Sequence, residues 1–395
     1  MGANESASPV LRRSSRISMS AWVMPMTLMI TGSACSSDDS IGGRSEDVVQ
    51  HLIRTDSSPH VGPDVWQTFV CRILETHDGD LYDMSGVRLI ESAEWIMAQL
   101  EPVTGYFERW SNGRYVVEFR VGGEVEVDVG GAEECVDAAL DRSAEGVDGV
   151  LVVADAQHRE DRVGGWGRGG HQCDDPCSVR ESKRAIYLGA ADFVADFPVV
   201  LDLVEHEFGH ALEWPHSFRN RPYDSGIDVM SDSAAPRRVD EARVHAPGVL
   251  AFNRYLSGWM EIDPLVVDSA AGGSVDLDPA RFALLKTASS RAISVEVIDN
   301  VFDNSHLDSG GVAVHLVDWD HRSCENPVRV NGIVGRFCLG AARSQQLVAP
   351  ESSRDGVMRT GDRVDVDGVT IVVESISYRS GSITASIRWE EDRQS

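Results

Sequence analysis

The sequence predicts an α+β fold built from two domains, with a boundary near residue 262. Three observations support this prediction. The chain of 395 residues is long enough for two domains. Residues 65–262 mix helical and strand-like hydrophobic periodicity, which predicts a twisted mixed sheet with helices. Residues 263–395 carry short β-branched runs separated by Gly, Asp and Asn, which predict an antiparallel β-sandwich.

The elements of the first domain follow from their hydrophobic patterns. Apolar residues at helical spacing predict a helix over residues 90–110, with an interruption near Pro102. Three further elements are expected: a strand at residues 115–120, a helix at residues 132–143 and a buried strand at residues 149–154. We expect the strand at residues 185–189 to form the sheet edge that receives an extended peptide. The glycine-rich residues 164–170 would flank that edge.

In the second domain, strands are expected at residues 292–298, 311–319, 364–366, 369–376 and 383–389. The loop after the first of them carries side chains with oxygen atoms, namely Asp299, Asn300, Asp303, Asn304 and Asp308. Such side chains could hold Ca²⁺, which prefers carboxylate and carbonyl oxygens. Their spacing is not that of an EF-hand, and we favour the interpretation that this is a solvated acidic loop.

The charge of the chain narrows the classes of partner. The chain has 63 acidic and 36 basic side chains, which gives a formal net charge of −27. No nucleic-acid partner is expected, because neutralising phosphates requires a basic surface. A polybasic membrane-binding patch is not expected either, since lysine occurs only as Lys183 and Lys286.

The N-terminus predicts export. Three arginines precede an apolar run at residues 21–30 and then small residues, which is the pattern of a signal peptide over residues 1–34. The run is too short to span a bilayer as a permanent helix. The cut site before Cys35 resembles a bacterial lipobox, so a lipid on Cys35 would anchor the chain to the membrane. Simple secretion is the alternative, and residues 35–64 predict a flexible linker.

Export would place the other six of the seven cysteines in an oxidising compartment, where they can pair. Proximity along the chain pairs Cys173 with Cys177 and Cys324 with Cys338. Cys71 and Cys135 are then left for each other. Other pairings are formally possible, so the sequence does not fix the connectivity.

One segment carries the chemistry, and it contains His206, Glu207, His210 and His216. Residues four apart share a face of a helix, so His206 and His210 can bind one metal ion together. Pro215 disfavours helical geometry in the residue before it, so the chain should leave the helix and bring His216 back as a third ligand. Three imidazoles and an open fourth position describe a catalytic zinc site. Glu207 would then act as the general base for a water that attacks a carbonyl.

These residues resemble the signature of the metzincin metalloproteases, and within them the gametolysin-like and immune-inhibitor-A-like secreted peptidases. The signature is H-E-x-x-H-x-x-G-x-x-H followed by a turn that contains methionine, and the three histidines and the glutamate fall on its ligand and base positions. The segment around Met230 resembles the methionine turn, which lies beneath the zinc in this family. Gly258 and Trp259 resemble the segment that often closes such catalytic domains. The resemblance implies a metzincin-like zinc peptidase domain in residues 65–262.

Glu213 departs from the signature, which has glycine where the chain turns toward the third histidine. A non-glycine residue in a left-handed conformation costs about 1–2 kcal/mol, which a fold can tolerate. His216 would then still bind. Alternatively, the helix continues by one residue and Glu213 itself becomes the third ligand, because two-His-one-Glu sites are legitimate zinc chemistry. We favour His216, since the methionine turn accompanies the three-histidine pattern.

Two functions are therefore consistent with the sequence. The leading hypothesis is an exported zinc-dependent endopeptidase that hydrolyses peptide bonds in protein or peptide substrates, with Glu207 as general base. It would be a cell-envelope lipoprotein anchored at Cys35, or secreted. The alternative is a surface lipoprotein on the same scaffold that has lost catalysis and serves as a binding or adhesion module. Glu213 supports the alternative, whereas the presence of Glu207 argues against it.

Overall fold

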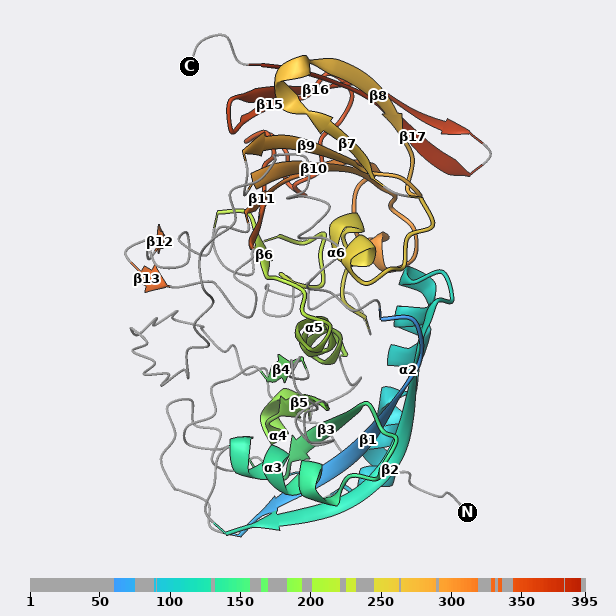
Figure 1. Cartoon of the computed structure of the whole chain (residues 1–395), viewed down its shortest axis with the longest axis vertical. Helices are drawn as coiled ribbons and strands as arrows, with labels where there is room; N and C mark the ends of the chain where they lie inside the picture. The colour runs from blue at the N-terminus through green and yellow to red at the C-terminus, as the bar shows by residue number, and fades with distance from the viewer. Residues whose placement is uncertain are drawn as a thin grey trace, which may run out of the picture.

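The α+β class expected from the sequence agrees with the computed structural model, which contains several sheets and few helices (Figure 1). The structure describes residues 60–74, 89, 91–128, 132–156, 165–169, 183–193, 201–220, 225–231, 245–262, 264–288, 291–318, 328–330, 333–335, 344–379 and 381–391. The predicted signal peptide, Cys35, most of the linker and the pairs Cys173–Cys177 and Cys324–Cys338 lie outside these residues. Within the described residues, no helix is both long and apolar enough to span a membrane.

The first half of the chain forms a five-stranded sheet. In spatial order its strands are β2 (Tyr115–Val127), β1 (Gly62–Ile73), β3 (Gly149–Ala154), β5 (Arg184–Leu188) and β4 (Trp166–Arg168). The first four run parallel, and β4 pairs antiparallel with β5. The predicted linker is therefore too long, because β1 already begins at Gly62.

The predicted sheet edge at residues 185–189 is wrong. The strand exists as β5, but it pairs with β3 on one side and with β4 on the other. Among the described residues the edge strand is β4, which lies inside the glycine-rich segment. Gly167 lets this strand approach a neighbouring helix so closely that a Cβ there would collide with the helix backbone.

Helices cover both faces of the five-stranded sheet. On one face α2 (Ala93–Trp110) and α5 (Asp202–Ala211) share a core with the sheet, and on the other face α3 (Ala132–Arg142) packs in a second core. The predicted interruption near Pro102 is wrong, because α2 runs through it. Leu100 and Val103 on either side of the proline are buried in the same core, so packing outweighs the lost backbone hydrogen bond. A Cys71–Cys135 disulfide joins β1 to α3.

The second half of the chain forms a six-stranded and a four-stranded sheet that share one hydrophobic core. The six-stranded sheet has the order β6 (Ser217–Phe218), β14 (Ser344–Leu347), β11 (Gly311–Asp318), β10 (Arg291–Ile298), β9 (Ala283–Ala288) and β7 (Leu265–Asp268). The four-stranded sheet has the order β15 (Arg363–Val366), β16 (Val369–Arg379), β17 (Ser382–Glu391) and β8 (Gly273–Leu277). The remaining short elements are α4 (Ala190–Phe193), α6 (Ala251–Leu256), β12 (Val328–Val330), β13 (Ile333–Gly335) and the 3₁₀ turns Ser269–Ala271 and Phe302–Asn304.

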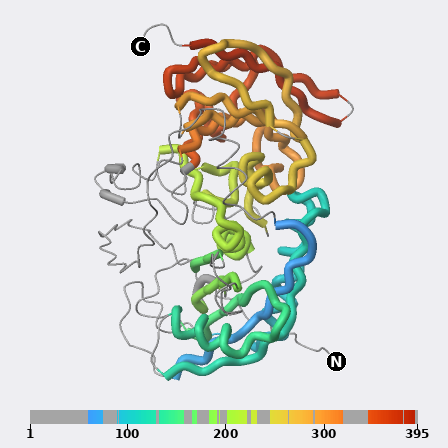
Figure 2. The backbone as a smooth tube through the Cα atoms, in the orientation of Figure 1, coloured from blue at the N-terminus to red at the C-terminus, as the bar shows by residue number. Residues whose placement is uncertain are grey.

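The two halves occupy opposite ends of the molecule, with α5 between them (Figure 1 and Figure 2). Two elements that precede residue 262 nevertheless belong to the upper part. The strand β6 pairs with β14, and α6 packs its apolar side chains against the six-stranded sheet. Segments that follow α5 but precede residue 262 therefore belong to the second half of the structure. The boundary at residue 262 stays a prediction.

Candidate metal centre

The helix α5 presents two different faces. Phe208 is fully buried, and its ring centroid lies 4.6 Å from that of Trp66 and 5.4 Å from that of Phe107. His206 and His210 lie one turn apart on another side of the helix, with ring centroids 4.7 Å apart. The 3.6-residue period thus separates a core-facing stripe from the two histidines, as the sequence predicts.

The helix ends in a Schellman motif. The backbone N–H of Trp214 donates to the carbonyl oxygen of Gly209 at 2.8 Å, and that of Glu213 donates to His210 at 2.9 Å. Glu213 is the left-handed residue of this motif, with φ of 64°. The helix therefore does not continue through Glu213, and the turn is made in the way that glycine normally makes it.

This turn brings His216 back to the helix. Its Nε2 lies 3.2 Å from Nε2 of His206 and 2.9 Å from Nε2 of His210. Among the described residues, these three form the one group of His, Cys, Asp or Glu side chains suited to hold a metal ion. Glu213 is not in this group, and its carboxylate packs beside Gly169 instead.

Burial keeps the three imidazoles neutral. It lowers the pKa of His206 to about 4 and that of His216 to about 3, and it lowers the pKa of His210 well below its ordinary value. His206 must carry its proton on Nδ1, because that atom lies 2.8 Å from the carbonyl oxygen of Val229, which can only accept. Its Nε2 therefore presents a lone pair to the centre of the group.

The three residues fit a zinc ion. Two nitrogens that each lie about 2.0–2.1 Å from one tetrahedral zinc are roughly 3.3 Å apart, close to the Nε2 separations found here. The low pKa values keep the rings of His206 and His216 neutral, and a neutral imidazole nitrogen with a free lone pair is the form that binds zinc, so the donor set suits a metal.

The residue Glu207 lies against the edge strand β4. It is 3 % exposed, and a Cβ added to Gly165 would lie 3.3 Å from its Cγ. A Cβ added to Gly167 would meet the Glu207 backbone and lie 3.2 Å from the Cβ of His210. The glycines of β4 thus allow a sheet edge to run directly alongside Glu207.

A buried turn packs against the helix that carries His206 and His210. Met230 is fully buried, and its sulfur occupies the space that a side chain at Gly209 would need. Ser217, the residue after His216, donates its hydroxyl to Asp228 at 2.5 Å and its backbone N–H to Met230 at 3.3 Å. Burial raises the pKa of Asp228 to about 7. The turn and the segment that carries the third histidine are therefore joined directly.

Sequence reasoning missed several residues around this centre. Ser217 and Asp228 are neighbours of motif residues, and this adjacency is a signal that could have found them. Glu205 is fully buried and accepts from His245 Nδ1 at 2.5 Å and from the Ala246 backbone at 2.7 Å. No local pattern marks it, because its partners lie far along the chain.

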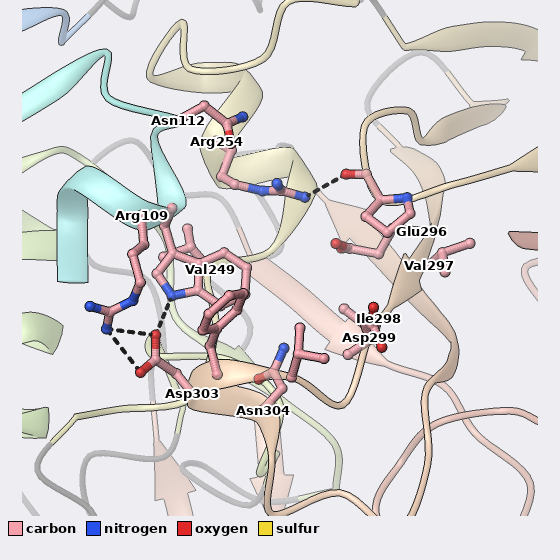
Figure 3. A pocket seen from close by; sticks show the side chains of 14 residues that line it. Arg109, Asn112, Val249, Arg254, Glu296, Val297, Ile298, Asp299, Asp303 and Asn304 are labelled. Atoms are coloured by element: carbon pink, nitrogen blue, oxygen red, sulfur yellow. Dashed lines mark hydrogen bonds and ion pairs between the residues drawn. The ribbon is translucent and has the colours of Figure 1, made fainter. Parts of the chain in front are cut away.

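The other predicted residues take structural places. Trp259 is fully buried, stacks on Tyr115 at 5.3 Å and donates its indole N–H to the His60 carbonyl at 2.7 Å. In the predicted calcium loop, the Asp303 carboxylate is engaged by Arg109 at 3.0 Å and by the indole of Trp110 (Figure 3). These three side chains are among those that line a cavity of about 370 Å³ between α2, α6 and β10. Calcium binding stays a prediction.

Comparisons with known proteins add little. No family model and no curated protein matches the chain. Among solved structures, metalloproteinase-II from Bacteroides fragilis is 14 % identical, with a TM-score of 0.27 over 53 % of this chain and 55 % of its own. A chaperone–substrate complex is 13 % identical, with a TM-score of 0.26 over 44 % of this chain and 31 % of its own. The chain thus spans about half of the metalloproteinase and about a third of the chaperone–substrate chain. Structural similarities this low support no conclusion about fold or function.

Proposed function

We propose that this protein is an exported zinc-dependent endopeptidase. The observation that carries the proposal is the convergence of three neutral imidazoles on one point, with Glu207 next to the first of them on the same helix. His206, His210 and His216 would hold the zinc, and the turn at Met230 would be the methionine turn of a metzincin-like domain. The α+β fold and the two C-terminal sheets around one core agree with a catalytic domain followed by a β-sandwich.

The residues around the centre suggest how peptide hydrolysis would proceed. Zinc bound there would supply a Lewis acid that activates water and polarises a carbonyl. Glu207 would take the proton from the attacking water and pass it to the leaving amine nitrogen. A substrate in extended conformation would add to β4, the edge strand of the sheet among the described residues, which runs beside Glu207 and so would bring the scissile bond to the base.

Cys35 would carry the lipid that anchors the protein to the cell envelope, or the chain would be secreted. The Cys71–Cys135 disulfide supports an oxidising location outside the cytosol. The substrate class is protein or peptide, because an open sheet edge recognises backbone rather than one side chain. No nucleic-acid partner is proposed for a chain of this acidity.

The test uses the mature chain with Cys35→Ser, which keeps the protein free of lipid. It is incubated with casein and with a quenched peptide library, with and without a zinc chelator. Chelator-sensitive cleavage, restored by added zinc, is expected. The control variant Glu207→Gln should bind zinc as tightly as the parent chain but lose cleavage.

A binding or adhesion module on the same scaffold is the competing function. Glu213 at the position of the signature glycine is the feature that favours it. Full zinc occupancy without cleavage of any peptide in the library, together with no difference between the parent chain and Glu207→Gln, would establish this alternative and overturn the endopeptidase.

A further inference from the structure

The segment that carries His216 is held by the C-terminal half of the chain. Directly after His216 the chain enters β6, which pairs in parallel with β14. The backbone N–H of Gln345 in β14 donates to the carbonyl oxygen of His216 at 3.3 Å. The Gln345 side chain is fully buried and donates through Nε2 to Oδ1 of Asn253 in α6 at 2.6 Å. The third histidine is thus bonded to a strand that is distant in sequence.

A second route leads from the C-terminal half to His206. Asn304 is 2 % exposed, and its Oδ1 accepts from the backbone N–H of Gly248 at 2.9 Å. The carbonyl oxygen of Gly248 accepts from Val229 at 3.0 Å, and the carbonyl oxygen of Val229 is the one that accepts from His206 Nδ1. Val229, whose carbonyl fixes the His206 tautomer, is therefore linked through Gly248 to a residue of the C-terminal half.

The loop that contains Asn304 is fixed in turn to the first half of the chain. Its neighbour Asp303 accepts from both Arg109 and Trp110 at the end of α2 (Figure 3). The two routes also meet each other, because Ser217 bonds to Asp228 in the same turn that presents the Val229 carbonyl. His206 and His216 are thus tied to one connected set of contacts to which both halves contribute.

We infer that Gln345 and Asn304 are positioning residues of the metal centre, and that the C-terminal half completes this centre rather than acting as an accessory domain. The inference rests on the metal binding in the proposed function, not on peptide cleavage. Its physical basis is that a group bonded to a metal ligand orients that ligand, and that losing such a group typically weakens metal binding by about 10- to 100-fold. Gln345 and Asn304 act one step further out, through β14 and through Gly248, so we expect the lower end of this range. Loosening β14 would let His216 move, and loosening Asn304 would let the Val229 carbonyl move.

The experiment measures zinc affinity in the full mature chain by competition with a chromophoric chelator. Gln345→Ala and Asn304→Ala are each expected to bind zinc about tenfold more weakly than the parent. Two variants serve as matched controls. Gln67→Ala removes the same side chain from β1, where its Oε1 accepts from the backbone N–H of Ala144 at 2.6 Å. Asn300→Ala removes an amide from the loop before Asn304. Both controls should bind zinc as the parent does.

A second measurement separates positioning from general stability. Cobalt(II) is loaded into each variant, and its visible absorption spectrum reports the ligand geometry. A residue that only stabilises the fold would lower the unfolding temperature and leave this spectrum unchanged. Gln345→Ala and Asn304→Ala should instead alter the spectrum at temperatures where the metal-free protein is folded.

Ser217 provides a milder variant if either alanine variant fails to fold. Ser217→Ala removes the bond to Asp228 and should also weaken zinc binding, whereas Ser217→Thr keeps a hydroxyl and should restore it. Parent-like zinc affinity and cobalt spectra in all three alanine variants would overturn the inference. If the parent chain binds zinc but cleaves nothing, the endopeptidase proposal is overturned. If the alanine variants then still bind zinc more weakly than the parent, the present inference is supported. A parent chain that binds no metal would overturn both.

Discussion

The left-handed turn at Glu213 allows a quantitative prediction about stability. The residue has φ of 64°, where a Cβ costs about 1–2 kcal/mol relative to glycine. Glycine loses about 0.5–1 kcal/mol more backbone entropy on folding, which offsets part of this gain. Glu213→Gly should therefore be more stable than Glu213→Ala by about 0.5–1 kcal/mol. The alanine variant is the right reference, because both changes remove the carboxylate that packs beside Gly169.

The assay is chemical denaturation of the metal-free protein, followed by tryptophan fluorescence, for the parent and both variants. Zinc affinity is measured in parallel and should stay within about twofold of the parent, since His216 and not Glu213 lies with the other histidines. Equal stability of the glycine and alanine variants would refute the strain argument. Loss of zinc in both variants would refute the ligand assignment and make Glu213 the third ligand.

Three further predictions concern the stability of the fold. Burial lowers the pKa of His315 to about 3, so the unfolded chain binds a proton below about pH 6.5 that the folded ring does not. The free energy of unfolding should fall as the pH drops through this window, and it should fall less in His315→Leu when both are measured by denaturant titration at pH 7 and pH 4. Opening the Cys71–Cys135 disulfide, which spans 64 residues, should lower the free energy of unfolding by about 4 kcal/mol. An unchanged denaturation midpoint under reducing conditions would contradict this. Phe208→Ala should lower the free energy of unfolding by about 3–5 kcal/mol, because the ring is fully buried against Trp66. A change below 1 kcal/mol would show that α5 is not anchored through this face.

Much of the first sheet was predictable because its signals are local. The apolar run at Gly149–Ala154 matches β3 residue for residue. The helix around Pro102 was predicted in place, but its continuity was not, since the packing of Leu100 and Val103 that holds it is a tertiary contact. The sheet edge was predicted on the wrong strand, because the glycines of β4 look like a loop until α5 lies against them.

The candidate site also has a part that the sequence predicts and a part that only the structure decides. His206 and His210 are one helical turn apart, so the sequence alone could place them together. The return of His216 could be anticipated from Pro215, but the choice between His216 and Glu213 could not be made from the pattern. The Schellman motif makes this choice, because it stops the helix before Glu213 would join the ligand face.

The sequence by itself determined the composition of the centre: three histidines and a glutamate at the spacing of one helix and one turn. These depend on backbone geometry within a few residues, which the order of amino acids dictates locally. Only the tertiary structure decided what holds them. The neutral state of the imidazoles comes from burial by elements far along the chain, and the support from Gln345 and Asn304 comes from backbone pairing and side-chain contacts between the two halves. Such contacts join residues that are far apart in sequence, and no local sequence pattern marks them, so they cannot be predicted from neighbouring residues.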